Sequence, residues 1–226
     1  MDEFRSRELI KSYAIRATRM SPAQQRAYQE LRSVYCVSAD KPVDPHEFFP
    51  ITSNPVYLEI GFGMGDATAE MARKLPGVNF LGIEVHKPGV GKLLAAVERD
   101  TLSNVRIIHD DALLAVEQMI APDSVDAVLV FFPDPWPKKR HHKRRIIRDS
   151  FVQLLVSRLR RGGFLYAVTD WVEYAQWMLD VFTRADGIGN AYAQYAEPQD
   201  WRPVTSFEKK GRLAGHDIRE LYFIRR

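Results

Sequence analysis

The sequence predicts an α/β fold built on a mostly parallel, doubly wound sheet with an antiparallel edge strand. From Val56 onward, short β-branched or aromatic runs alternate with amphipathic stretches, as in successive βα units. Glycine or proline ends two of the amphipathic stretches, at Pro76-Gly77 and at Gly162-Gly163. Two late β-like segments, 191–196 and 220–226, flank a loop at 197–217 and are expected to pair antiparallel at one edge of the sheet.

The alternation defines the elements of this sheet one by one. The expected strands are 56–61, 79–85, 105–110, 126–132 and 164–170. The expected helices are 67–75, 90–100, 112–120, 145–161 and 171–186. Helix 145–161 is expected to end at Gly162-Gly163, because glycine commonly follows the last turn of a helix.

The first fifty residues predict a separate N-terminal part, so the chain is expected to divide into 1–50 and 51–226. Residues 1–20 are basic without apolar periodicity, which suggests an arm. Ser21 is a suitable N-cap with Gln24 completing a capping box, and the helix that it starts is expected to end near Val37. A linker rich in Pro, Asp and Ser then leads into the second part. A length of 226 residues accommodates one α/β domain with such an appendage.

Composition favours a cytoplasmic protein that is not inserted in a membrane. The N-terminus is charged and has no apolar core of a secretory signal, and the longest apolar run, 127–132, is too short to cross a bilayer. The single cysteine, Cys36, has no Cys or His partners at metal-ligand spacing, so no metal site is expected. The net charge is only +3, so the distribution of the basic residues matters more than their number.

A glycine-rich turn follows the first expected strand and predicts a ligand loop. It contains Glu59 and three glycines in a G-x-G-x-G pattern, Gly61, Gly63 and Gly65. A dinucleotide fingerprint would need a small residue at position 66, where the chain has Asp66, and a pyrophosphate beside two carboxylates is disfavoured. S-adenosylmethionine carries an ammonium and a sulfonium cation and no phosphate, so the loop suits this cofactor better. The alternative is that Glu59 is a satisfied carboxylate at a strand end.

Two further acids follow the next two expected strands. Glu84 stands about 20 residues after Gly61, the interval typical of an acid that accepts hydrogen bonds from ribose hydroxyls. Asp111 closes the third strand, where it or Asp110 could receive the adenine amino group. Because the carboxyl ends of parallel strands bind ligands in open α/β folds, three acids at these ends predict a cofactor site.

A proline-rich turn, called here the Asp134 loop (residues 133–137), follows the fourth strand. Its three prolines restrict the backbone around Asp134 and Trp136, as a preorganised site would require. An ordinary strand exit with a solvated aspartate is the alternative. The basic segment (residues 138–145) comes next and predicts either a solvated face or a polyanion contact, and its place beside the site favours RNA. It comprises Lys138, Lys139, Arg140, His141, His142, Lys143, Arg144 and Arg145.

Two other segments are candidates for the same site. Asp170 ends the fifth expected strand, and Thr205, Ser206, Phe207 and Glu208 form a short polar stretch in the late loop. A structural role is equally compatible with these residues, since Asp170 also suits a helix cap.

The segments EIGFGMG, FLGIEVHKPGVG, FFPDPWPKKRHHKRR, VTDW and RPVTSFEKKG together closely resemble the bacterial tRNA (guanine-N7)-methyltransferase family. The resemblance extends from about Val56 to the end of the chain. It implies a Rossmann-like class I methyltransferase fold, S-adenosylmethionine as methyl donor, and methylation of N7 of guanine 46 in the variable loop of tRNA. By the same resemblance, the cofactor-binding acids are Glu59, Glu84 and Asp111.

The resemblance also implies roles for the other candidate residues. Asp134 matches the catalytic position, and residues 140–145 match the RNA-contact segment. The substrate-binding positions are matched by Lys138, Asp170, Thr205, Ser206, Phe207 and Glu208.

Guanine N7 has a lone pair and no proton, so methylation there needs positioning more than a general base. Asp134 is therefore expected to orient the base by accepting hydrogen bonds from guanine N1–H and N2–H, and Trp136 could stack on it. Two alternatives stay open. The Asp-Pro-Trp sequence faintly resembles loops of enzymes that methylate exocyclic amines, and a catalytically silent RNA-binding module could keep the same fold. The sequence leaves open whether the protein is a monomer or a homodimer.

Overall fold

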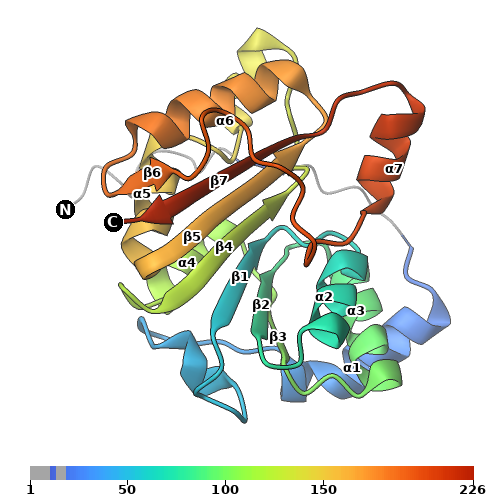
Figure 1. Cartoon of the computed structure of the whole chain (residues 1–226). Helices are drawn as coiled ribbons and strands as arrows, with labels where there is room; N and C mark the ends of the chain where they lie inside the picture. The colour runs from blue at the N-terminus through green and yellow to red at the C-terminus, as the bar shows by residue number, and fades with distance from the viewer. Residues whose placement is uncertain (1–10, 14–18) are drawn as a thin grey trace.

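The computed structural model describes residues 11–13 and 19–226 and centres on a seven-stranded sheet with the order β3-β2-β1-β4-β5-β7-β6 (Figure 1). All pairings among the first five strands are parallel, and β7 runs antiparallel between β5 and β6. The predicted doubly wound sheet is therefore confirmed. The strands are β1 (Val56–Ile60), β2 (Asn79–Ile83), β3 (Val105–Ile108), β4 (Val125–Phe131), β5 (Leu159–Thr169), β6 (Ile188–Asn190) and β7 (Arg219–Arg225).

Helices of the described part of the chain cover both faces of the sheet (Figure 1). One face carries α1 (Pro22–Tyr35), α2 (Asp66–Lys74) and α3 (Lys87–Asp100) over one apolar cluster. The other carries α4 (Ala112–Met119), α5 (Asp149–Arg158) and α6 (Val172–Arg184) over a second cluster. Because both faces are covered, the central strands are apolar on both sides, which explains their continuous hydrophobic runs. Within the described residues, no helix combines the length and apolar character needed to span a membrane.

The N-terminal helix α1 forms as predicted and packs on the rest of the fold. Ser21 accepts a hydrogen bond from the Gln24 backbone and Gln24 closes the capping box, but the helix ends at Tyr35, two residues earlier than expected. A Cβ atom on Gly91 of α3 would lie 2.7 Å from the Gln24 carbonyl oxygen, so only glycine permits this approach. The division of the chain at residue 50 remains a prediction, and most of the predicted basic arm lies outside the described residues.

The expected linker contains more structure than its composition indicates. Its Pro45–Phe48 segment forms the short 3₁₀ helix η1, capped by Asp44. Just before the linker, the Val37 N–H donates to the Ile107 carbonyl and extends the sheet beyond β3. These contacts join the segment between α1 and β1 to the body of the protein.

The prediction that helix 145–161 ends at Gly162-Gly163 is wrong. Helix α5 ends at Arg158, and β5 begins at Leu159 and runs through both glycines. The register between β4 and β5 shifts here, because Val125 pairs with Leu159 whereas Ala127 pairs with Phe164. Gly162 has a φ of +78°, and a Cβ on Gly163 would lie 2.8 Å from the Asp126 carbonyl oxygen. The glycine pair therefore marks a β-bulge, which favours the same residue type as a helix end.

The predicted late strands are only half correct. Segment 220–226 corresponds to β7, but 191–196 is not a strand, and only its last residue, Ala196, forms an isolated bridge with Glu220. Strand β6 lies just before it and stops at Asn190, whose side chain accepts from the Tyr192 N–H and donates to the Gln194 carbonyl. This Asx-type turn bends the chain out of the sheet. The expected loop beyond it contains helix α7 (Ser206–Leu213).

Replacing Gly91 by valine should force α1 away from α3. We expect Gly91→Val to lower the free energy of unfolding by about 1–3 kcal/mol, the usual cost of overpacking a tight contact. Urea denaturation measures this free energy of unfolding. Gly77→Ala is the control, because a Cβ at Gly77 has no atom within 4 Å. An unchanged stability of Gly91→Val would contradict the packing of α1 described here.

Candidate active site

A cavity of about 710 Å³ opens at the carboxyl ends of β1, β2 and β4. The strand order reverses between β1 and β4, so this is the switch point where open α/β sheets bind ligands. Most of the wall that the structure describes comes from four segments, residues 59–67, 83–86, 130–134 and 203–207. The other lining residues are Ser12, Tyr13, Glu70, Asp110, Ala112, Ile146, Lys209 and Lys210. The volume lies in the range of small-molecule and cofactor sites.

The glycine loop (residues 61–65) forms one side of the cavity. Gly61 and Gly63 have φ values of +71° and +60°, and an ideal Cβ atom on either would meet nothing within 4 Å. Their backbone therefore faces open space, as a ligand loop requires. Gly65 differs, because it caps α2 and its Cβ would lie 2.7 Å from the Cβ of Leu93. All three predicted glycines thus line the cavity, and Gly65 in addition lets α2 pack against α3.

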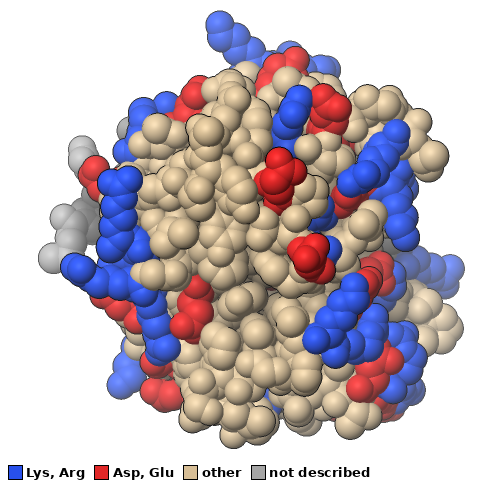
Figure 2. Space-filling model, viewed as in Figure 1, with Lys and Arg blue, Asp and Glu red and all other residues tan. Residues whose placement is uncertain are grey.

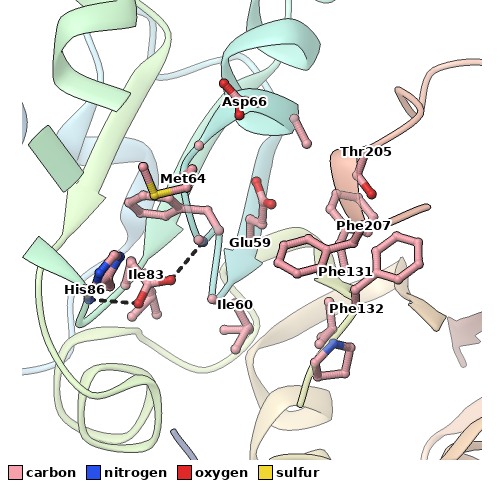
Figure 3. Close-up of a pocket in the computed structure, with 18 of the residues that line it drawn as sticks. Glu59, Ile60, Met64, Asp66, Ile83, His86, Phe131, Phe132, Thr205 and Phe207 are labelled. Atoms are coloured by element: carbon pink, nitrogen blue, oxygen red, sulfur yellow. Dashed lines mark hydrogen bonds between the residues drawn. The ribbon is translucent and has the colours of Figure 1, made fainter. Parts of the chain in front are cut away.

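Glu59 lies at the base of the cavity, between the glycine loop and an aromatic wall that includes Phe131 and Phe132 (Figure 3). It is 2% exposed, and burial raises the pKa of its carboxyl group to about 7 although Thr68 Oγ1 donates to it at 2.7 Å. The nearby carboxylate of Glu84 raises this pKa further. A buried acid of this kind becomes ionised most readily when a cation binds beside it.

Glu84 closes the glycine loop from the neighbouring strand. Its carboxylate accepts hydrogen bonds from the backbone N–H groups of Gly63, Val85 and His86, each at 2.8 Å. Glu84 also lines the cavity. It therefore holds the loop in shape while keeping its carboxylate at the ligand space, which is a role that sequence spacing alone does not reveal.

The two acids after β3 have different positions. Asp110 lines the cavity, whereas Asp111 caps α4 by accepting from the N–H groups of Leu113 and Leu114. Of the two candidates for contact with an adenine amino group, Asp110 is therefore the one whose position meets the cavity. The structure shows Asp111 only as the N-cap of α4.

The Asp134 loop is strained on both sides of Asp134. Phe132 and Trp136 have φ values of 49° and 44°, a region that bulky residues seldom adopt, and each precedes a proline. The Phe132 N–H still pairs with the Val168 carbonyl of β5, and buried Arg145 donates to the Pro135 carbonyl at 2.9 Å. These bonds hold the loop in place, and Asp134 lines the cavity.

Helix α7 and the residues before it form the opposite wall. The Phe207 ring stacks on Phe132 with centroids 6.3 Å apart, and Thr205 caps the helix by accepting from the Glu208 N–H. Thr205, Ser206 and Phe207 line the cavity, as do two lysines, Lys209 and Lys210. Glu208 and Asp170 do not belong to the lining among the described residues, and their side chains pair with other residues of the protein.

The basic segment divides into an exposed and an internal part. Its central residues form the 3₁₀ helix η2 (Lys139–Arg144), with exposed side chains at Lys138, Lys139, Arg140 and Lys143. Figure 2 shows Lys and Arg side chains around much of the edge of one face and over α7, with acidic side chains among them and a largely uncharged centre. Arg145 is 3% exposed and packs on Tyr174 and Trp177, so its guanidinium supports the segment from beneath and is badly placed to contact RNA.

Trp136 and Arg144 hold residues 11–13 beside the site. The Arg144 guanidinium lies 3.8 Å from the centre of the Trp136 ring and donates to the carbonyls of Lys11 and Tyr13. The Trp136 indole N–H donates to the Ser12 carbonyl. His141 packs edge-on against the same ring, and His142 contacts Arg145. Arg144 therefore already covers one face of the Trp136 ring on which a base was expected to stack.

Sequence reasoning missed several cavity residues. Ser12 and Tyr13 belong to none of the motifs that were singled out, and His86, Phe131 and Phe132 lie within such motifs without having been assigned a role in the site. His86 follows Glu84 by two residues, so its position just after a predicted strand could have indicated that it lies at the cavity.

The raised pKa of Glu59 predicts a pH-dependent stability. Because the folded pKa of about 7 exceeds the ordinary value of 4.5, the cost of ionising Glu59 appears as pH rises through this window. We expect Glu59→Gln to gain stability relative to the natural chain between pH 5 and pH 8, by up to about 3 kcal/mol. Urea unfolding at pH 5 and pH 8 measures the stability difference between the variant and the natural chain, and the exposed Glu117→Gln is the control. A pH-independent difference would contradict the burial of this carboxyl.

The sequence is similar to those of known methyltransferases. Residues 53–221 match a family model described as "Putative methyltransferase". The tRNA (guanine-N(7)-)-methyltransferase of Paraburkholderia xenovorans is 48% identical over 226 residues, covering 100% of this chain and 86% of that protein. The protein of the same name from Methylobacillus flagellatus is 45% identical over 222 residues, covering 98% and 93%.

Solved structures show the same fold at low sequence identity. The 16S rRNA methyltransferase KamB superposes with a TM-score of 0.57 at 17% identity, covering 93% of this chain and 97% of that one. TrmN from Thermus thermophilus gives a TM-score of 0.53 at 18% identity, covering 77% and 45%. The class I methyltransferase fold expected from the sequence is thereby confirmed, and by sequence the chain belongs to the tRNA (guanine-N7)-methyltransferase family.

Proposed function

We propose that this protein transfers a methyl group from S-adenosylmethionine to N7 of guanine 46 in the variable loop of tRNA. The observation that carries the proposal is a single cavity with the glycine loop and buried Glu59 on one side and Asp134 with Phe207 on the other. One side suits a cationic cofactor and the other suits a flat base. The names of the relatives give the same substrate and the same atom.

The residues of the glycine loop fit S-adenosylmethionine. Open space beside Gly61 and Gly63 allows close approach of a ligand to the backbone, and Glu84 offers a fixed carboxylate to ribose hydroxyls. Glu59 offers a negative charge that forms most readily beside a cation. When bound, the cofactor supplies a methyl group on a positively charged sulfur. We assign Asp110, together with the start of helix α4 that Asp111 caps, to the adenine end.

The residues on the other side fit a guanine presented edge-on. N7 already has a lone pair, so the protein must aim this atom and need not remove a proton. The N1–H and N2–H donors lie on the edge opposite to N7. A carboxylate at Asp134 that accepts from them would direct N7 inward and offset the charge that develops on the ring. The stacked pair Phe132 and Phe207 offers an apolar surface for the base.

The exposed part of the basic segment is proposed to bind the tRNA backbone. Lys138, Lys139, Arg140 and Lys143 follow directly on the Asp134 loop, so phosphates bound there would lie next to the target base. Such contacts position the nucleic acid and contribute most of the salt-dependent affinity, whereas the cavity selects the base.

Bulk tRNA that lacks N7-methylguanosine tests the proposal. With labelled S-adenosylmethionine, we expect one labelled nucleoside, N7-methylguanosine, and its position in the variable loop can be mapped by chemical cleavage. Label in an exocyclic N-methylated nucleoside would overturn the assignment of the atom, and cofactor binding without any transfer would indicate a silent RNA-binding module.

Asp134→Asn should separate chemistry from binding. The change keeps the shape but places an amide donor against the guanine donors. We expect single-turnover methylation under saturating tRNA and cofactor to slow by about a hundredfold or more, the cost of removing a preorganised electrostatic group. Cofactor affinity should change little, because the glycine loop is untouched. If the variant methylates tRNA at the rate of the natural chain under saturation, Asp134 has a structural role only.

Neutralising the exposed cations tests the RNA surface. The triple variant Lys139→Gln, Arg140→Gln, Lys143→Gln should weaken tRNA binding and lower the log–log salt slope by about 0.7–0.9 for each phosphate that the variant no longer neutralises. Binding titrations at several salt concentrations measure both values. The matched control is Lys41→Gln, Lys74→Gln, Arg161→Gln, which removes the same charge at the opposite end of the sheet. If both triple variants change tRNA affinity and the salt slope equally, the net charge of the protein determines binding and the basic segment has no specific role.

A further inference from the structure

Helix α7 forms a wall of the cavity but has almost no apolar attachment to the protein. Its buried residues are Glu208 and Gly211, while Phe207 is 57% and Leu213 is 89% exposed. Helices on globular proteins ordinarily bury an apolar stripe. The position of α7 must therefore be determined by polar contacts.

The first of these contacts is a buried ionic cluster, called here the polar anchor (Tyr166, Arg202, Glu208 and Glu220). The Arg202 guanidinium donates to Glu208 on α7 and to Glu220 on β7, both at 2.5 Å, and to the Tyr166 hydroxyl on β5 at 3.2 Å. Tyr166 also donates to Glu220. The anchor therefore connects α7 to the two strands beneath it.

The charges in this cluster are balanced. Arg212 of α7 donates to the second oxygen of Glu208 at 2.7 Å, so two arginines face two glutamates. Burial alone would raise the pKa of Glu208, but the hydrogen bonds from Arg202 and Arg212 lower it below its ordinary value. Glu208 is thus an ionised carboxylate with cationic partners for both oxygens, which leaves it poorly placed to receive a substrate.

The second contact joins α7 to the end of β5. A Cβ atom on Gly211 would lie 2.8 Å from Asp170 Oδ2 and 3.0 Å from its Cβ, so the helix backbone rests directly on this side chain. The same Asp170 oxygen lies 3.4 Å from His216 Nδ1, just beyond the helix. Asp170 therefore supports α7 at a point separate from the polar anchor.

We infer that Arg202, Glu208 and Asp170 are positioning residues that set α7, so that Phe207, Lys209 and Lys210 face the substrate from the cavity wall. This inference rests on the proposed function for the identity of the substrate. It assigns Glu208 and Asp170 an indirect action on tRNA, in place of the direct binding that the family resemblance implies. In some proteins a buried ion pair fixes geometry while adding little net stability, and we assign the same role to the pairs that position α7.

Gly211→Ala tests this inference without altering any charge. Alanine favours the helix itself, but its methyl group would push α7 away from Asp170. We expect kcat/KM for tRNA to fall roughly tenfold to a hundredfold, because misplacement by about an ångström is costly in catalysis. We also expect faster hydrogen exchange of the α7 amides, with an unchanged KM for S-adenosylmethionine. Glu208→Gln should give the same pattern, because the Arg202 and Arg212 ion pairs are removed.

Leu213→Ala is the control on the same helix, since this side chain is 89% exposed, and it should leave exchange and kinetics unchanged. Natural kinetics and exchange in Gly211→Ala, together with abolished turnover in Glu208→Gln, would overturn the inference and make Glu208 a direct substrate ligand. If the natural chain transfers no methyl group to tRNA, the proposed function fails. Hydrogen exchange of α7 still tests the positioning role in that case, because it needs no substrate.

Discussion

Parallel pairing of β1 with both β2 and β4 places the glycine loop, the turn at Glu84 and the Asp134 loop at the same edge of the sheet. The residues concerned are far apart in the chain, and they meet only because each follows a strand that runs in the same direction. Layers of helices on both faces keep the strands in this order. The cavity, its acids and its aromatic wall are all consequences of this one arrangement.

The charged residues of the site also fall into two groups, one inside the cavity and one on the outer surface. On the side assigned to the cofactor, backbone N–H groups hold the carboxylate of Glu84, whereas buried Glu59 has a raised pKa and ionises most readily when a cation binds beside it. On the outer side the cations of η2 remain exposed, where they can meet phosphates. An acidic interior and a basic rim fit a cationic cofactor and an anionic macromolecule in one site.

Much of this arrangement was predictable from the sequence, and the failures have physical causes. Strand patterns placed Gly61, Glu84 and Asp134 at the ends of predicted strands, and the structure has all three in the lining of one cavity. Gly162-Gly163 misled the prediction because glycine suits a β-bulge as well as a helix end. Arg145 and Glu208 looked like surface ligands, since only tertiary contacts reveal that one packs against Trp177 and the other pairs with Arg202.

The central claim is that the cavity aims guanine N7 at the methyl donor. Transcripts of one tRNA that carry either guanosine or 7-deazaguanosine at position 46 test this claim, because the analogue keeps the N1–H and N2–H donors and replaces only N7 by C–H. Both transcripts should bind with similar affinity, and only the guanosine transcript should accept labelled methyl groups. Transfer to the 7-deazaguanosine residue would contradict the claim and would place the reaction on another atom.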